Sequence, residues 1–284
     1  MPELPEVETV RRVLEPQIRG LVIKNAVVNR PEVVAYPDAD AFIAALRNQV
    51  VAGIDRRGKF LSILLESGDG VIVHFRMTGC LLFTPPVFEM EKHTHIILQM
   101  ENEWQLRFVD TRRFGRFWYL KADEMHKESG EDTVTGIGNL GKEPFDSDFN
   151  SRYLIDRLEK RRIPIKECLL DQKVIAGIGN IYSDEILFAS GIDPRKPANE
   201  LTDEEWNSLA CEIPEQLTYF IEKNVISPEE YLAGKGKDYR NTPYLRVYGR
   251  SGKPCTKCGE TLCKCVIGGR SSVYCPNCQR GREC

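Results

Sequence analysis

Residues 2–9 read Pro-Glu-Leu-Pro-Glu-Val-Glu-Thr and begin the first helix that we expect in the chain. Apolar residues recur at helical spacing through positions 4–18, which predicts one amphipathic helix. Pro5 and Glu6 suit the first turn of such a helix, where a missing N–H and a negative charge are both tolerated. The helix is expected to end near Gly20.

Pro2 and Glu3 precede this helix, and the helix requires neither of them. Met1 is followed by a small residue, so we expect its removal, which would leave the secondary amine of Pro2 at the N-terminus beside the carboxyl group of Glu3. A reaction that begins with an amine attacking a carbon needs a nucleophile and an acid that manages protons. The pair therefore indicates catalysis, although an N-terminal proline alone is common.

The composition is that of a globular protein with an uneven charge. The 284 residues are enough for roughly two domains, and 42% are hydrophobic. No apolar run is long enough for a membrane span, and no signal peptide is visible, so a cytoplasmic location is expected. The net charge is −3, but residues 235–284 carry +8, with eleven Lys/Arg and three Asp/Glu. A basic module on an acidic body indicates a polyanionic partner, with a solvated charged tail as the alternative.

Short β-type runs separated by turn residues follow the first helix and predict a β-sandwich rather than a parallel sheet. Helical patterns take over in the second half. A kink or a break is expected at Pro214 inside the last long helix, and residues 226–246 are expected to be mainly a loop. The expected strands are 21–29, 60–65, 71–75, 94–100, 105–109 and 116–120, and the expected helices are 38–48, 147–160, 165–170, 181–190 and 202–223.

Four cysteines near the C-terminus have the spacing of a zinc ribbon. Cys255 and Cys258 form one Cys-x₂-Cys pair, and Cys275 and Cys278 form a second one sixteen residues later. Two tight turns that each present two thiolates suit a single tetrahedral zinc ion. The residues between the pairs predict a β-hairpin with its tip near 268–270. Further cysteines lie at 263, 265 and 284 and leave the ligand set open.

Four other segments carry residues suited to DNA. Arg112 and Phe114 lie on one turn and Met77 on another; an arginine can read a base edge and an apolar side chain can wedge between base steps. Two glycines precede Asn180, which can cap a helix whose N-terminus approaches a phosphate. Lys59 follows a glycine and is a candidate phosphate contact. Ordinary core packing or a solvated charge explains each of these residues equally well when it stands alone.

Together these segments resemble the formamidopyrimidine-DNA glycosylases. The resemblance rests on residues 2–9, 74–79, 92–95, 110–115 and 176–182 and on the cysteine ribbon, in order along nearly the whole chain. It implies a monomeric DNA repair enzyme that flips out oxidised purines such as formamidopyrimidines and 8-oxoguanine from double-stranded DNA, excises them and then cleaves the abasic site by β,δ-elimination. The implied α+β architecture is a β-sandwich domain at 1–130, a linker at 131–147, a helix–two-turn–helix domain at 148–246 and a zinc finger at 247–284.

The resemblance also implies a role for each site residue. Pro2 would form the Schiff base, Glu3 would supply protons, and Lys59 and Arg270 would assist the lyase steps. Met77, Arg112 and Phe114 would fill the space of the flipped nucleotide. The further DNA-binding residues would be Glu6, which supports the site, and His74, His93, Arg161, Asn180 and Tyr248.

One departure from the family pattern concerns the lesion. The family has a Gly/Ser-rich stretch where this chain reads Asn-Val-Ile-Ser-Pro-Glu-Glu-Tyr at 224–231, which puts a strict preference for 8-oxoguanine in doubt. Two alternatives therefore stand beside the purine glycosylase. One is an oxidised-pyrimidine glycosylase resembling endonuclease VIII, against which Met77, Arg112 and Phe114 argue. The other is a non-catalytic DNA-binding protein, which would have no need of Pro2 with Glu3.

Overall fold

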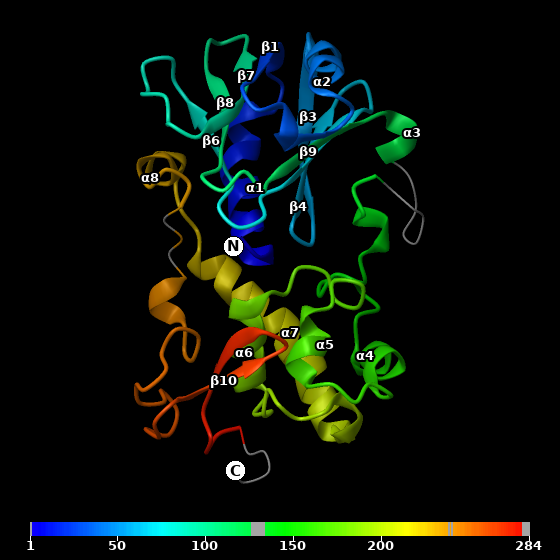
Figure 1. The fold of residues 1–284 in the computed structure, drawn as a ribbon, viewed down its shortest axis with the longest axis vertical. Helices are drawn as coiled ribbons and strands as arrows, with labels where there is room; N and C mark the ends of the chain where they lie inside the picture. Colours follow the sequence, from blue (N-terminus) through cyan, green and yellow to red (C-terminus); the bar gives the residue numbers. More distant parts are fainter. Residues whose placement is uncertain (1, 126–133, 238, 240, 280–284) are drawn as a thin grey trace. The chain divides into compact units, whose positions relative to one another are not determined.

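A computed structural model describes residues 2–125, 134–237, 239 and 241–279 of the chain, which divides into two compact units (Figure 1). Unit 1 comprises Met1–Asn139 and Asn224–Arg240. Unit 2 comprises Leu140–Lys223 and Asn241–Cys284. Each unit is therefore built from two separate stretches of chain. The expected linker at 131–147 lies partly outside the described residues.

The described residues of unit 1 contain nine strands in the order β2-β9-β5-β4-β3-β1-β7-β8-β6. All neighbouring pairs are antiparallel except β2 with β9. β1 and β3 share only two residue pairs, Val22 with Val50 and Ile23 with Gln49. The strands therefore fall into two sheets joined at this short seam, and the predicted β-sandwich is confirmed. The strands are β1 Val22–Val28, β2 Val34–Tyr36, β3 Gln49–Arg57, β4 Phe60–Leu65, β5 Gly70–His74, β6 Cys80–Thr84, β7 Thr94–Met100, β8 Gln105–Val109 and β9 Arg116–Leu120.

The first helix buries its apolar stripe on this sheet structure. α1 spans Leu4–Ile18, as the spacing predicts, and it packs against β3, β4 and β6. Leu14 and Ile18 are fully buried in the core of unit 1. The other helical segments of this unit are η1 Pro31–Val33, α2 Ala39–Leu46, α3 Ala122–Met125, η2 Ile137–Asn139 and α8 Pro228–Ala233.

Unit 2 is helical and ends in a hairpin. The helices pack around α6 and α7, and α6 also packs against strand β11 of the hairpin. The elements are α4 Ser151–Leu158, α5 Ile165–Leu170, α6 Asn180–Ala189, η3 Ala198–Glu200, α7 Asp203–Lys223, η4 Thr242–Tyr244, β10 Cys263–Ile267 and β11 Arg270–Tyr274. No helix among the described residues is both long enough and apolar enough to cross a membrane.

The structure excludes a break at Pro214 and corrects a second prediction about helices. α7 continues without a break through Pro214, because the helix is long and its apolar face is buried on both sides of the proline. The segment expected to be mainly a loop contains α8. Ser227 caps this helix, Pro228 occupies its first position and the Glu230 side chain returns to the Ser227 backbone, which together form a capping box.

Helix α8 belongs to unit 1, where its Tyr231 side chain is buried. Tyr231 is 3% exposed within the core of unit 1, and its hydroxyl donates to the Leu81 carbonyl oxygen on β6 at 3.0 Å. After α8, the Cys80 thiol donates to the Lys235 carbonyl oxygen at 3.5 Å. The segment after α7 is thus attached to an outer strand of unit 1.

Candidate active site and nucleic-acid interface

The N-terminal pair lies at the start of α1, where both residues are buried. Pro2 lies directly before Glu3, which is 2% exposed and is the N-cap of α1. The Glu3 N–H donates to Glu6 Oε2 at 2.7 Å, so Glu6 fixes the backbone that follows Pro2. The expected removal of Met1 concerns a residue outside the described part of the chain.

Lys59 lies on the turn between β3 and β4 and is 8% exposed. An ion pair links α1 to this turn: Arg56 Nε donates to Glu8 Oε2 at 3.2 Å, while Arg56 Nη1 donates to the Gly58 carbonyl oxygen at 3.3 Å. Burial alone would raise the pKa of Glu8, but Arg11, Arg12 and Arg56 outweigh it and lower that pKa to about 2. Glu8 therefore stays ionised and holds the helix next to the turn that carries Lys59.

Met77, Arg112 and Phe114 come together, although they lie on two turns far apart in the sequence. Met77 is 44% exposed and Phe114 is 46% exposed, which is unusual for large apolar side chains. Arg112 lies between them: Nη1 donates to Met77 Sδ at 2.9 Å, and Cζ lies 4.6 Å from the centre of the Phe114 ring. The three residues form one exposed cluster, which we call the wedge.

A single buried carboxylate braces both turns of the wedge. Asp110 is fully buried; Oδ2 accepts the Gly115 N–H at 2.8 Å and Oδ1 accepts the Arg112 N–H at 3.1 Å. The Thr78 hydroxyl, next to Met77, donates to the same Oδ1. A Cβ on Gly115 would lie 2.4 Å from the Phe108 ring, so only glycine fits there. The wedge is therefore exposed at its tip and rigidly held at its base.

The two histidines of the predicted interface lie beside these turns. His74 is 8% exposed, and its Nδ1 accepts the Arg76 N–H at 3.0 Å. Burial and the positive charges of Arg76 and Lys59 lower the pKa of His74 to about 3, so the ring is neutral. His93 is half-buried, and its carbonyl oxygen accepts the Asp110 N–H at 3.0 Å.

In unit 2, Asn180 holds the finger hairpin instead of capping its helix. The N-cap of α6 is Gly179, and Asn180 is the first helical residue. Asn180 Nδ2 donates to the Ser271 carbonyl oxygen at 3.1 Å. Ser271 follows Arg270, which is exposed and pairs with Ile267 across a two-residue turn. The predicted hairpin tip is confirmed.

A fully buried ion pair fixes the same strand. Lys166 on α5 and Asp184 on α6 are 0% and 1% exposed, and Lys166 Nζ lies 2.6 Å from Asp184 Oδ1. Asp184 also accepts the Ser272 hydroxyl at 2.6 Å and the Val273 N–H at 3.0 Å. Lys166 Nζ donates to the Ser271 carbonyl oxygen at 3.0 Å. Burial raises the pKa of Asp184 against the effect of Lys166 and its hydrogen bonds.

Two other predicted contacts of unit 2 are placed as follows. Arg161 is half-buried and its Nη1 donates to Asp171 Oδ2 at 2.8 Å, so its charge is already paired. Tyr248 is half-buried, and its N–H donates to Glu185 Oε1 at 2.9 Å. Glu185 is fully buried and also accepts the Val247 N–H at 2.9 Å. A second buried carboxylate on α6 thus positions the chain that carries Tyr248.

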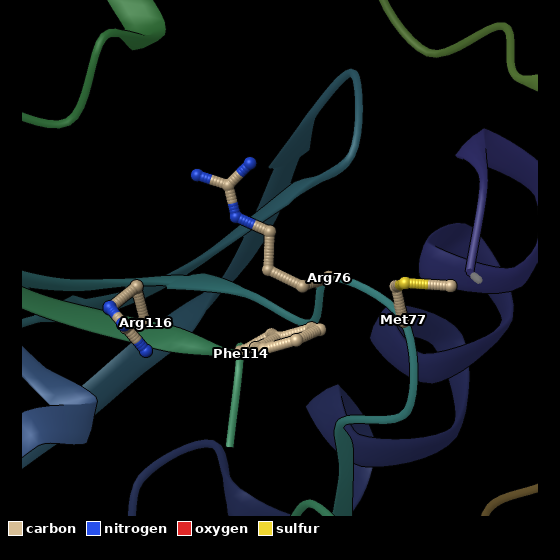
Figure 2. A pocket seen from close by; sticks show the side chains of 4 residues that line it. All are labelled: Arg76, Met77, Phe114 and Arg116. Atoms are coloured by element: carbon tan, nitrogen blue, oxygen red, sulfur yellow. The ribbon is translucent and has the colours of Figure 1, made fainter. Parts of the chain in front are cut away.

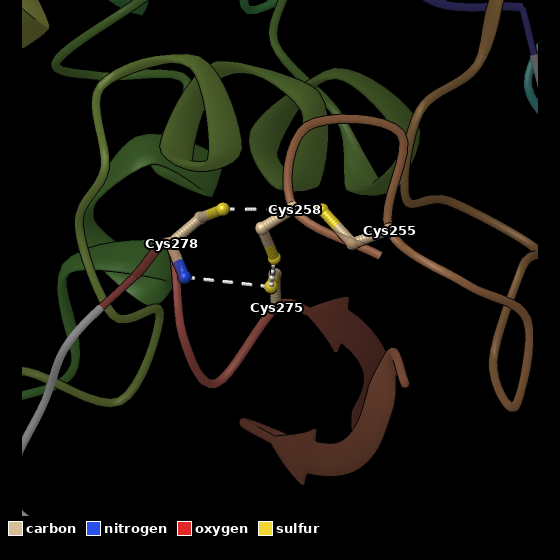
Figure 3. Close-up of side chains that lie close together, drawn as sticks. All are labelled: Cys255, Cys258, Cys275 and Cys278. Carbon is tan, nitrogen blue, oxygen red and sulfur yellow. Dashed lines mark hydrogen bonds between the residues drawn. The ribbon is translucent and has the colours of Figure 1, made fainter. Parts of the chain in front are cut away.

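The four outer cysteines form a candidate metal centre (Figure 3). All four Sγ atoms lie within 4.8 Å of one another. The Cys255 and Cys278 sulfurs are 3.9 Å apart, and those of Cys258 and Cys275 are 3.5 Å apart. A tetrahedral zinc ion with bonds of about 2.3 Å places its sulfur ligands about 3.8 Å apart, so the donor set fits zinc. Cys263 and Cys265 lie on β10, outside this group.

The residues that sequence reasoning missed are mostly the buried charges that hold these turns. Asp110 is visible in the Asp110–Gly115 turn, but its role depends on Thr78, which is distant in the sequence. Lys166 and Asp184 have no local signal, because each reads as a surface charge on a helix. Asp184 and Glu185 do follow Asn180 by about one helical turn, but this spacing alone does not indicate that they are buried.

Comparison with known proteins agrees with this geometry along the whole chain. The profile of the formamidopyrimidine-DNA glycosylase N-terminal domain matches residues 1–117, and that of the H2TH domain of the same enzymes matches residues 140–229. The formamidopyrimidine-DNA glycosylase of Moorella thermoacetica is 44% identical over 262 residues, which are 92% of this chain and 93% of that protein. The one from Pelotomaculum thermopropionicum is 40% identical and covers 99% of both chains.

Solved structures with the same fold contain damaged DNA. Lactococcus lactis Fpg in complex with FAPY-dG-containing DNA has a TM-score of 0.87 and 32% identity, with 98% of this chain and 100% of that chain covered. The same protein with DNA containing an abasic site has a TM-score of 0.87, 30% identity and the same coverage. The chain belongs to the formamidopyrimidine-DNA glycosylase family of DNA repair enzymes.

Proposed function

We propose that the protein removes oxidised purines from double-stranded DNA and cleaves the resulting abasic site, with Pro2 as the nucleophile. The observation that carries this proposal is the position of Pro2 directly before the buried Glu3, whose backbone Glu6 holds. The relatives are formamidopyrimidine-DNA glycosylases, and a solved neighbour binds FAPY-dG-containing DNA. We further propose that the protein is a monomer and acts in the bacterial cytoplasm, on the nucleoid.

The proposed chemistry begins at the amine of Pro2. Its nitrogen attacks C1′ of the flipped nucleotide, and the bond from C1′ to the damaged base breaks. Opening of the sugar between C1′ and O4′ gives an iminium ion, and Glu3 supplies the proton that the oxygen requires. The iminium ion makes the C2′ proton acidic, so its loss expels the 3′ phosphate, and a second elimination expels the 5′ phosphate. Lys59 and Arg270 assist these steps by stabilising the phosphates.

The wedge takes the place that the damaged nucleotide leaves. Flipping a base costs a few kcal/mol, and the cost is lower for a damaged base. Met77 and Phe114 restore stacking contacts, and Arg112 faces the unpaired base. His74, His93, Arg161, Asn180 and Tyr248 complete the proposed DNA contacts, with His74 and Asn180 acting by holding the neighbouring turns. To contact DNA, the Arg161 side chain must give up its hydrogen bond to Asp171 and bind a phosphate instead.

Borohydride trapping tests the nucleophile. The protein is incubated with duplexes that contain 8-oxoguanine, an oxidised pyrimidine or an abasic site, and the cross-linked peptide is mapped by mass spectrometry. We expect a cross-link at residue 2, with the purine lesion favoured over the pyrimidine. Glu3→Gln is expected to bind DNA but to cleave it far more slowly. A cross-link at Lys59, or tight binding without any cross-link, would contradict the proposal; a preference for the pyrimidine would favour the endonuclease VIII-like alternative.

We propose that one structural zinc ion is bound by Cys255, Cys258, Cys275 and Cys278. Support comes from the sulfur–sulfur distances of 3.9 Å and 3.5 Å. The ion would stabilise the finger that carries Arg270. Metal analysis is expected to show one zinc per chain, its loss in Cys278→Ser and its retention in the matched variants Cys263→Ser and Cys265→Ser. If the Cys278→Ser variant still binds one zinc per chain, Cys278 is not a ligand and the proposed ligand set is wrong.

A further inference from the structure

A hollow of about 420 Å³ lies beside the wedge and is lined by Arg76, Met77, Phe114 and Arg116 (Figure 2). Met77 and Phe114 give it exposed apolar surface, and the two arginines give it positive charge. None of its four lining residues is acidic. The role proposed for the wedge uses Met77 and Phe114 but leaves both arginines without a task.

Arg76 is presented by a turn that the protein holds in an uncommon conformation. Its φ of 54° lies in the left-handed region, which residues other than glycine rarely occupy. The hydrogen bond from its N–H to the neutral ring of His74 holds it there. The Arg76 side chain is exposed and makes no hydrogen bond or ion pair with any residue that the structure describes. Figure 2 shows its guanidinium group extending away from the Phe114 ring.

Arg116 is held more firmly on the other side of the hollow. It is the half-buried first residue of β9, and its Nη1 donates to the carbonyl oxygens of Arg113 at 3.0 Å and Gly115 at 2.8 Å. Among the described residues it has no carboxylate partner. Two cations that share a hollow without an acid are suited to an anion.

The neighbouring apolar surface indicates which anion. When Met77 and Phe114 meet the base stack, the sugar–phosphate backbone must pass the sides of the wedge. A guanidinium group can donate two parallel hydrogen bonds to one phosphate. We propose that Arg76 and Arg116 form a phosphate-binding site that holds the DNA backbone beside the point where the wedge enters the duplex. This inference rests on the proposed function of the wedge.

Salt-dependent binding tests the site independently of the chemistry. The parent, Arg76→Gln, Arg116→Gln and the double variant are titrated with a duplex that contains an uncleavable tetrahydrofuran abasic analogue, at several salt concentrations. Each lost phosphate contact is expected to reduce the slope of log affinity against log salt by about 0.9. Arg113→Gln is the matched control, because Arg113 is also exposed, has a φ of 57° and lies 3.8 Å from Glu32. It is expected to keep the parent slope.

Replacing single phosphates with methylphosphonates identifies the contact. We expect one replacement beside the lesion to weaken the parent and Arg113→Gln but not the double variant. Borohydride trapping is expected to remain at the parent level in the control Arg113→Gln. Arg76→Gln should fold like the parent, because the Arg76 side chain has no partner among the described residues. Arg116→Lys keeps the positive charge and serves as a second variant if Arg116→Gln fails to fold. Unchanged salt slopes in both Arg76→Gln and the double variant would overturn the inference, whereas a parent that cannot be trapped would overturn only the proposed function.

Discussion

Both units place exposed residues of the proposed DNA interface on a turn or strand whose backbone is held by a buried carboxylate, but the two carboxylates have different partners. In unit 1, Asp110 is held by the N–H groups of Arg112 and Gly115 and by a hydroxyl. In unit 2, Asp184 has similar partners and also a fully buried cation, Lys166. The hydrogen-bond partners given for Asp110 are neutral N–H and hydroxyl groups, whereas Asp184 is also paired with the positively charged Lys166. The consequences of losing one partner should therefore differ.

The largest effect is expected for Lys166→Met, which leaves Asp184 buried without its cation. Removing one partner of a buried ion pair costs about 3–5 kcal/mol, while replacing both with apolar residues is often nearly neutral. Urea unfolding of unit 2 should show this loss in the single variant and its recovery in Lys166→Met combined with Asp184→Leu. Lys196→Met is the control, because the Lys196–Glu205 pair is partly exposed and should contribute about 1 kcal/mol or less. Equal losses in Lys166→Met and Lys196→Met would show that the buried charge needs no partner.

Asp110→Asn should have a smaller but more local effect. An amide cannot accept hydrogen bonds on both sides, so one of the Arg112 and Gly115 N–H groups loses its partner. The expected loss for a charge-assisted hydrogen bond is on the order of 1.5–3 kcal/mol, measured by unfolding of unit 1. Cleavage of a lesion-containing duplex should slow more than cleavage of a duplex with an abasic site, since flipping depends on the wedge.

Asp38→Asn is the matched control for that substitution. Asp38 caps α2 in the same unit by accepting the Ala41 N–H at 2.9 Å, and asparagine caps a helix equally well. Its stability and its cleavage of both duplexes should match the parent. If Asp110→Asn behaves in the same way as this control, Asp110 does not hold the wedge.

Low pH is expected to remove the stabilising effect of the ionised Glu8 side chain. Its folded pKa of about 2 lies below the ordinary value of 4.5, so its stabilising effect is complete above pH 4.5 and is lost as the pH falls towards 2. We expect on the order of 1–2 kcal/mol, because Arg11 and Arg12 are partly exposed to solvent. Glu8→Gln should lack this part of the acid unfolding curve. A variant with the same pH dependence as the parent would mean that other groups account for it.

The smallest effect on stability is expected for a hydrogen bond between two neutral groups, which attaches α8 to β6. Tyr231→Phe keeps the ring in the core but removes the hydrogen bond to the Leu81 carbonyl oxygen. The cost should be about 0.5–1.5 kcal/mol, measured as a lower Tm for unit 1. Tyr244→Phe on the partly exposed η4 should leave the Tm within error of the parent. A Tyr231→Phe variant as stable as this control would show that packing alone attaches α8.

The sequence predicts the elements with a strong local pattern and misses those defined by distant contacts. α1, β4, β7 and β8 follow their apolar periodicity closely. The sequence does not predict β3, which ends in the charged residues Asp55, Arg56 and Arg57, but β4 pairs with all three of them. The sequence does not predict β6, because four apolar residues followed by a threonine do not distinguish a strand from other buried chain.

The candidate site shows the same division. The cysteine spacing is local, so the sequence predicts the metal-ligand group that the structure brings together. Ser227 and Glu230 have the spacing of a capping box, which is a local signal for the six-residue α8. Pro228 and the nearby glycines nevertheless favour a loop in the sequence-based prediction. Arg112 contacts Met77, and Asp110 contacts Thr78, only because the order of the strands brings their two turns together. No local sequence pattern indicates that order.

The discontinuity of unit 1 has a consequence for biosynthesis. Residues up to Asn139 leave the ribosome first, yet Tyr231 is part of the core that they build. The ribosome must add all of Leu140–Lys223 before that side chain becomes available, and synthesis proceeds at only about 5–20 residues per second. During that interval the nascent sandwich exposes apolar surface that α8 later covers. A nascent chain arrested near residue 200 should therefore bind chaperones and be cut by protease in unit 1, and one long enough for α8 to have left the ribosome should resist both.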